Sequence, residues 1–176
     1  VGVYIPVLTG TFYTPILNTV DAELRKTGQH MVVAFGNGEG NAREQACSGL
    51  DFLFERGCDG VLAITDALGE DDIAALGSWR ERMVVLNHHY SSIPEQCFSV
   101  DHVSGGRLAA RTLLDLGHRR LAVIGGPRNA ADNVARVGAF LDELEVAGIP
   151  RDACPVFDGD YSPVSYTHLR AHETLR

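Results

Sequence analysis

Short apolar runs alternate with amphipathic segments along the first 90 residues of the chain. The apolar runs have the length and composition of buried strands and cover residues 1–6, 30–35, 60–64 and 83–86. The segments between them repeat apolar residues at helical spacing, and we expect helices at residues 15–26, 42–56 and 70–80. Strands that are apolar throughout are buried on both faces, as in parallel sheets covered by helices. The pattern predicts an α/β fold with a doubly wound parallel sheet.

Two of these helices have well-defined apolar faces. The first is expected to bury Ile16, Leu17, Val20 and Leu24. The second is expected to bury Ala46, Leu50, Leu53 and Phe54. Gly28 and Gly57 follow the two segments, and glycine is the residue that most easily adopts the positive φ found just beyond helix ends. These faces indicate that both helices pack against the sheet.

A second alternation begins near residue 100, within the segment 99–127. Apolar residues at helical spacing occur there at Leu108, Ala109, Leu113 and Leu116. Gly117 ends this predicted helix, and residues 121–124 form the next short apolar run before a glycine-rich turn. A helix over residues 130–147 and a strand at residues 156–157 continue the pattern.

We therefore predict two lobes with a boundary near Val100. Residues 1–99 form the N-terminal lobe, and residues 100–163 form a partial C-terminal lobe. The second lobe has too few strands to close a sheet by itself, so we expect it to be incomplete. The chain also lacks an initiator methionine, and we interpret it as a piece truncated at both ends.

Residues 164–176 do not continue the alternation and have no clear amphipathic period. Their sequence, including VSYTHLRAHET, matches one translated frame of a transposase adaptor used in sequencing libraries. We interpret this segment as a non-native tail. The alternative is a genuine polar tail in which His168 and His172 bind a metal ion from one helix face, although two imidazoles without a third ligand make a weak site.

Composition narrows the classes of function. The net charge of −8 is unlike a surface that follows nucleic-acid phosphates, which needs clustered Lys and Arg. No apolar run approaches the roughly 18 residues of a membrane span, and no signal-peptide pattern is present. The four cysteines are widely scattered, as expected for reduced thiols in a cytoplasmic protein. We expect a cytoplasmic protein that does not associate with membranes.

No motif in the chain carries recognisable catalytic chemistry. The glycine-rich loop at residues 36–41 fails the dinucleotide fingerprint at Asn41 and follows the second strand rather than the first. The turn at residues 125–127 lacks the Lys and Ser/Thr of a phosphate-binding loop. No nucleophile elbow or zinc-protease motif occurs. We therefore expect neither an enzyme nor a bound cofactor or metal, and a Rossmann-type enzyme would need the missing fingerprint.

Residues that follow the predicted strands have the chemistry of a small-molecule site. They are Phe12, Tyr13, Thr65, Asp66, Asn87 and the segment 128–136, which contains Asp132 and Arg136. Ligands of open α/β sheets bind beyond the carboxyl ends of the strands. Aromatic rings stack on the C–H faces of sugars, while amide, carboxylate and guanidinium groups bind hydroxyls. The alternatives are that Phe12 and Tyr13 staple the first helix and that Asp66 caps the third.

Several stretches together resemble the LacI/GalR family of transcriptional regulators. The resemblance covers residues 1–162 and includes VGVYIPVLTGTFYTPIL, RGCDGVLAI, MVVLNHHYSSIPEQCFSVD, the segment 99–127 and ARVGAFLDELEVAGI. It implies a type I periplasmic-binding-protein-like core of two α/β lobes that binds a small effector, typically a sugar. It also implies a homodimer that binds operator DNA through an N-terminal helix-turn-helix, which this chain does not contain. The stretch from ALGEDD to PEQC is most similar to the galactose-repressor branch.

The resemblance also implies roles for individual residues. Phe12 and Tyr13 match the aromatic pair that lines the family's binding cleft, and Asn87 matches a frequent Asp or Asn. Arg136 matches the arginine that binds a sugar hydroxyl or a carboxylate, and would equally serve a purine or a phosphorylated sugar. Asp132 and Thr65 match positions that contact ligand in some members. Residues 7–11 and Ala130 depart from the common pattern of the family, so the shape of the pocket beside them is not implied.

Two functions remain open from the sequence. The first is the effector-sensing core of a regulator, in which the ligand shifts the population of lobe arrangements and thereby changes operator affinity. The second is a periplasmic or extracellular sugar-binding protein of a transport system with the same fold.

Overall fold

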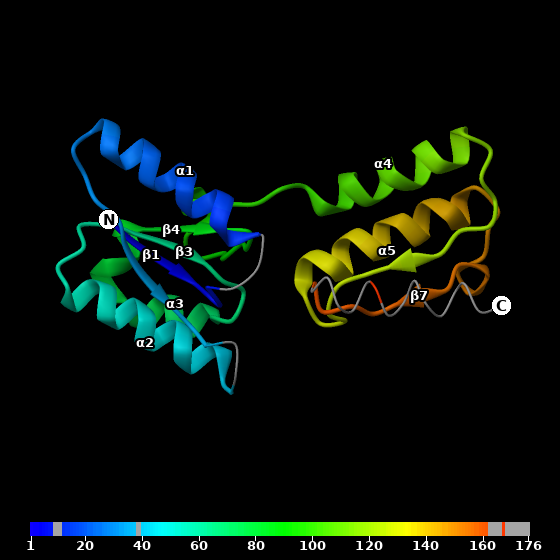
Figure 1. Cartoon of the computed structure of the whole chain (residues 1–176). Coiled ribbons are helices and arrows are strands. Elements are labelled where there is room, and N and C mark those ends of the chain that lie inside the picture. The colour runs from blue at the N-terminus through cyan, green and yellow to red at the C-terminus, as the bar shows by residue number, and fades with distance from the viewer. Residues whose placement is uncertain (9–11, 38–39, 162–166, 168–176) are drawn as a thin grey trace. The chain divides into compact units, whose positions relative to one another are not determined.

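The first part of the chain forms a five-stranded parallel sheet in the order β2-β1-β3-β4-β5 (Figure 1). In the computed structural model, which describes residues 1–8, 12–37, 40–161 and 167, the chain divides into two compact units, Val1–Ser99 and Val100–Arg176. The strands of the first unit are β1 (Gly2–Ile5), β2 (Val32–Phe35), β3 (Val61–Ile64), β4 (Met83–Leu86) and β5 (Cys97–Phe98). This arrangement confirms the predicted α/β fold with a doubly wound parallel sheet.

Helices cover both faces of this sheet. Helix α1 (Tyr13–Lys26) lies on one face, and α2 (Ala42–Glu55) and α3 (Glu70–Ala75) lie on the other (Figure 1). Side chains of β1 alternate between the faces: Val3 and Ile5 belong to the cluster with α1, while Tyr4 belongs to the cluster with α2. Strand β1 is therefore buried on both sides, as the continuous apolar run predicts.

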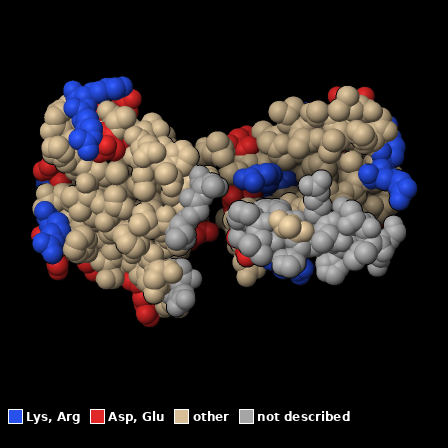
Figure 2. Space-filling model, in the orientation of Figure 1, with Lys and Arg blue, Asp and Glu red and all other residues tan. Residues whose placement is uncertain are grey.

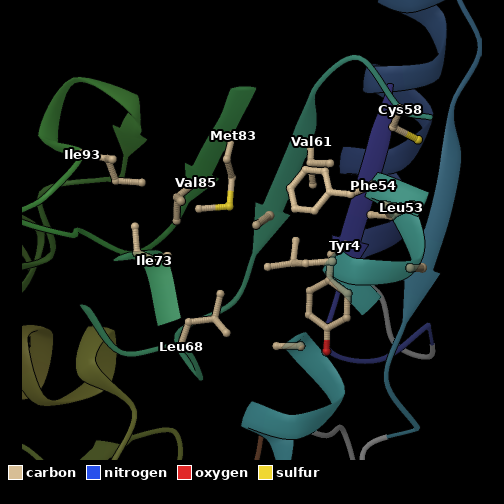
Figure 3. Close-up of a cluster of buried hydrophobic side chains, with 14 of the residues drawn as sticks. Tyr4, Leu53, Phe54, Cys58, Val61, Leu68, Ile73, Met83, Val85 and Ile93 are labelled. Atoms are coloured by element: carbon tan, nitrogen blue, oxygen red, sulfur yellow. The ribbon is translucent and has the colours of Figure 1, made fainter. Parts of the chain in front are cut away.

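The larger of the two apolar clusters packs α2 against the sheet (Figure 3). Leu53 and Phe54 point from α2 toward Tyr4 and Val61 (Figure 3). The structure confirms the predicted inward face of this helix, whose members Ala46, Leu50, Leu53 and Phe54 are all buried. On the other face, Ile16, Leu17 and Val20 of α1 pack against the sheet as predicted.

The predicted helix at residues 70–80 was wrong in its second half. Helix α3 ends at Ala75, and a 3-10 helix follows at Gly77–Arg82. Gly77 has a φ of +57°, a left-handed conformation that an α-helix does not accommodate. A shorter 3-10 turn, Pro94–Gln96, precedes β5.

The second unit contains two long helices and a two-stranded parallel sheet. The helices are α4 (His102–Asp115) and α5 (Ala131–Val146), and the strands are β6 (Val123–Ile124) and β7 (Val156–Phe157). A 3-10 turn, Arg151–Ala153, leads into β7. The buried cluster of this unit comprises Ala110, Phe140, Leu144, Ile149 and Cys154. Residues 164–176, predicted to be a non-native tail, lie outside the described residues except for Thr167.

The apolar face predicted for α4 was partly wrong. Leu108 and Leu116 are 67% and 70% exposed, whereas Gly106 and Ala110 are buried. The reason is the close approach of α5, which favours small residues at the contact. A Cβ atom on Gly106 would overlap the carbonyl oxygen of Arg136 and lie 3.2 Å from Cβ of Ala139.

Adjacent glycines of α4 provide a matched test of this contact. Gly106→Ala is expected to destabilise the second unit because the new methyl group must push α5 away. Gly105→Ala is expected to stabilise it by about 0.5–1 kcal/mol, since a Cβ there meets nothing within 4 Å and alanine favours the helix. Urea unfolding of the two variants measures both effects, and equal stability changes of the same sign would contradict the close approach.

Candidate ligand-binding site

The carboxyl ends of β1 and β3 define the first part of the candidate site. These strands are neighbours in the sheet, and the chain leaves them toward helices on opposite faces. Such a reversal of the strand order creates a crevice beyond the carboxyl ends in open α/β sheets. The segment after β1 leads to Phe12 and Tyr13, and the segment after β3 begins with Thr65 and Asp66. The residues predicted from the first and third strands therefore come to the same edge of the sheet.

The two aromatic residues differ in their surroundings. Their ring centroids lie 5.1 Å apart with an interplanar angle of 85°. Tyr13 is half-buried and packs on the cluster of Val3, Ile5 and Ile64, whereas Phe12 is 58% exposed. Tyr13 thus anchors the start of α1, and its edge-to-face contact supports a Phe12 ring that presents apolar surface to solvent.

Thr65 and Asp66 also differ in burial and in their contacts. Thr65 is buried, and its hydroxyl oxygen accepts a hydrogen bond of 3.1 Å from the backbone N–H of Ala67. Asp66 is exposed. The N-cap of α3 is Gly69, whose N–H donates to Asp72 at 2.8 Å, so Asp66 does not cap that helix. Thr65 shapes the turn, and the Asp66 carboxylate faces solvent.

Asn87 follows β4 in a conformation that few residues adopt. Its φ is +66°, in the left-handed region that asparagine tolerates better than most residues. Its backbone N–H donates to the carbonyl of Phe98 at 2.8 Å, which fixes the backbone at the end of the strand. The exposed amide side chain is therefore presented from a constrained position.

Helix α3 anchors the segment that follows Asn87. The Glu70 carboxylate accepts hydrogen bonds from the N–H of Ser91 at 2.5 Å and from the hydroxyl of Ser92 at 2.6 Å. The Ser92 hydroxyl and the Ser91 N–H hold the pKa of Glu70 below its ordinary value. Tyr90 is buried and donates to the carbonyl of Leu68 at 3.2 Å, and burial raises the pKa of its phenol.

In the second unit, the two predicted residues Asp132 and Arg136 meet within a polar cluster. They lie one helical turn apart at the start of α5, with Arg136 Nη2 3.4 Å from Asp132 Oδ2. Arg136 Nη2 also lies 2.9 Å from His102 Nδ1, and the Tyr161 hydroxyl lies 3.1 Å from Asp132 Oδ2. The cluster therefore joins α4, α5 and the segment after β7.

Sequence reasoning missed His102 and Tyr161. Tyr161 could have been identified from the sequence, because it is an aromatic residue a few positions beyond a strand, like the aromatic residues after β1. His102 could not: it begins a helix, and its partner lies 34 residues away on another. Only the packing of α4 against α5 brings these side chains together.

The loop between β6 and α5 is held by one buried side chain. Asn133 Oδ1 accepts from the N–H of Gly126 at 2.7 Å, and Asn133 Nδ2 donates to the carbonyl of Pro127 at 3.3 Å. Gly126 leaves room for the ring of Tyr161, which a Cβ atom would overlap. This glycine-rich turn thus receives an aromatic ring and an amide side chain.

The described surface carries charges of both signs. Figure 2 shows Lys and Arg in small separate groups among acidic and uncharged residues on the visible face. Among the described residues, no group of three or more His, Cys, Asp or Glu is placed to hold a metal ion. His168 and His172, which bind a metal ion only in the alternative interpretation of the tail, lie outside the described residues. No described helix has the length and apolar character required to cross a membrane.

A family model of periplasmic binding proteins and the sugar-binding domain of the LacI family matches residues 1–162. The chain belongs to this family, which confirms the resemblance inferred from its motifs. The chain is 42% identical to a transcriptional regulator of the LacI family from Burkholderia phymatum, with a TM-score of 0.85 over 98% of this chain and 64% of that one.

Two further relatives bear on the ligand. The chain is 23% identical to the HTH-type transcriptional regulator GalS of Salmonella typhimurium, over 85% of this chain and 43% of that protein. It is 26% identical to a LacI family regulator from Enterococcus faecium with bound ribose, with a TM-score of 0.78 over 98% of this chain and 62% of that one. The chain thus spans less than half of the length of GalS.

The carboxylate of Glu70 gives a pH-dependent test of the anchored segment. A carboxyl whose folded-state pKa is depressed stabilises the fold above its ordinary pKa, and this stabilisation is lost as the pH falls through the folded value. We expect wild-type stability to decline more steeply between pH 6 and pH 3 than that of Glu70→Gln. Thermal unfolding across this range measures the slopes, with Glu55→Gln on exposed α2 surface as control. Parallel slopes for all three proteins would contradict the role of Glu70.

Proposed function

We propose that this chain is the effector-binding core of a bacterial transcriptional regulator and that its effector is a sugar or a related small molecule. The observation that supports the proposal is that β1 and β3, the strands that precede Phe12 and Asp66, are neighbours at the switch point of a LacI-family sheet. The ribose bound to the Enterococcus faecium relative supports the ligand class.

Each unit presents different candidate ligand-binding groups. In the first unit, the exposed ring of Phe12, supported by Tyr13, stacks on the C–H face of a sugar, and Asp66 and Asn87 bind its hydroxyls. Thr65 acts mainly through the turn that it stabilises. In the second unit, Arg136 donates to an oxygen of the ligand, and Asp132 orients the guanidinium group.

Binding is proposed to act through a shift of population. A ligand favours one of two conformations of the protein by its differential affinity for them, and it cannot shift the equilibrium by more than that difference. In a homodimer, this shift changes the spacing of two DNA-binding domains and hence the affinity for operator DNA. The DNA-binding domain is proposed to lie outside the present chain, in a cytoplasmic protein.

A periplasmic sugar-binding protein is the second candidate, because the matched family includes periplasmic binding proteins. The regulator is favoured by the 42% identical structure, which is a transcriptional regulator, and by four free cysteines, two of them buried. Sequencing the gene upstream of Val1 distinguishes the two. A helix-turn-helix domain of about 60 residues supports the regulator, and a secretory signal overturns it.

Arg136 provides the sharpest test of the proposed site. Arg136→Ala in the full-length protein is expected to weaken sugar binding about 5- to 150-fold, corresponding to about 1–3 kcal/mol for an unpaired polar partner. Calorimetry against D-galactose, D-ribose, glucose 6-phosphate and hypoxanthine identifies the ligand class and measures the loss. Arg151→Ala, at the far end of α5 where Arg151 pairs with Glu145, is the matched control and should bind normally. Unchanged affinity in Arg136→Ala would show that the site is wrongly assigned.

A further inference from the structure

His102 contacts the Arg136 side chain from a neighbouring helix. It is the first residue of α4, and the close approach of α4 and α5 at Gly106, one turn later, brings it to the start of α5. His102 Nδ1 lies 2.9 Å from Arg136 Nη2, closer than the 3.4 Å between this nitrogen and Asp132 Oδ2. The imidazole is therefore the nearer of these two partners of the guanidinium group.

The chemistry of the pair determines the state of the imidazole. A guanidinium group has N–H donors and no acceptor, so His102 Nδ1 must accept the hydrogen bond. The single ring proton of a neutral imidazole then lies on Nε2. His102 Nε2 is buried and has no hydrogen-bond partner among the described residues. Because a buried, unpaired N–H costs free energy, this arrangement does not serve stability alone.

Protonation of His102 would abolish the contact. An imidazolium ion has no acceptor and would place a second positive charge beside Arg136. The charged groups around the pair are Asp132 on α5 and Asp101 beside His102. Asp132 also accepts a hydrogen bond from the Tyr161 hydroxyl. Asp101 is already occupied, since it accepts from the N–H and hydroxyl of Ser104 at 2.8 and 2.7 Å. Imidazole is the side chain that ordinarily titrates between pH 5 and 8.

We propose that His102 is a positioning residue that holds Arg136 in its ligand-binding orientation only while the imidazole is neutral. The proposal rests on the function proposed for Arg136 and adds a pH dependence to it. Ligand affinity then decreases when the imidazole is protonated, because an imidazolium ion cannot accept a hydrogen bond from the guanidinium group.

Two substitutions at His102 distinguish loss of the hydrogen-bond acceptor from loss of the group that can be protonated. His102→Asn retains an acceptor, Oδ1, near the place of Nδ1 and does not titrate. His102→Ala removes the acceptor. His118→Asn changes an exposed histidine in the turn after α4 and is the matched control. Each variant is made in the full-length protein and titrated calorimetrically with D-galactose and D-ribose at pH 6.0 and pH 8.0.

A different binding result is expected for each variant. Wild type and His118→Asn should bind about two- to fourfold more weakly at pH 6.0 than at pH 8.0, as expected for an ordinary imidazole, whereas His102→Asn should bind equally at both. His102→Ala should bind about tenfold more weakly than wild type at pH 8.0 while its melting temperature is retained or increased. In an Arg136→Ala background, His102→Ala should have no further effect on affinity.

The outcomes distinguish failure of this inference from failure of the proposed function. If Arg136→Ala leaves affinity unchanged, the assignment of Arg136 to the site is wrong. If Arg136→Ala weakens binding but wild type and His102→Asn share one pH profile, His102 does not position Arg136. If neither sugar binds, imidazole 15N spectra of the ligand-free protein decide: an Nε2–H tautomer that is lost in Arg136→Ala supports the inference, and an Nδ1–H tautomer overturns it.

Discussion

Burial of β1 on both faces is the constraint on which the first unit depends. All four of its residues, Gly2–Ile5, are buried, with Tyr4 facing α2 and its neighbours facing α1. A strand buried in this way must have helices on both sides, so the connections that leave β1 and β3 diverge to opposite faces. In open α/β sheets, such a divergence marks the edge at which ligands bind. The place of the candidate site is therefore a consequence of how the core is covered.

The second unit depends on a different constraint, the approach of two helices at Gly106. Without a side chain at that position, the backbone of α5 lies close to α4, and residues one turn away meet across the interface. His102 and Arg136 are such a pair. The same approach explains why Leu108 and Leu116 are not part of the buried face, although their spacing is helical. The small residues Gly106 and Ala110 mark the contact instead.

The spacing of apolar residues predicted most of the fold, whereas the sequence predicted the candidate site only in part. The inward face of α2 was predicted residue by residue because continuous apolar spacing and burial coincide there. The end of α3 was not, since Gly77 was not recognised as a helix terminator. Phe12, Thr65 and Asn87 were found by position after strands. A residue such as His102 cannot be recognised from a single sequence, because tertiary packing alone creates its contact with a distant helix.

Contacts within the protein hold several residues of the candidate site in place. Tyr13 is packed on the sheet, Thr65 is engaged in its turn, and the backbone at Asn87 is fixed by a bond to Phe98. Ordering a side chain on binding costs about 0.5–1.5 kcal/mol, so a site ordered in advance retains more of its contact energy as affinity. The exposed side chains of Phe12 and Asp66 belong to residues next to Tyr13 and Thr65, which these contacts hold in place. A fixed donor or acceptor penalises a ligand that cannot reach it more than a mobile one would, so such an arrangement favours selectivity for the proposed sugar.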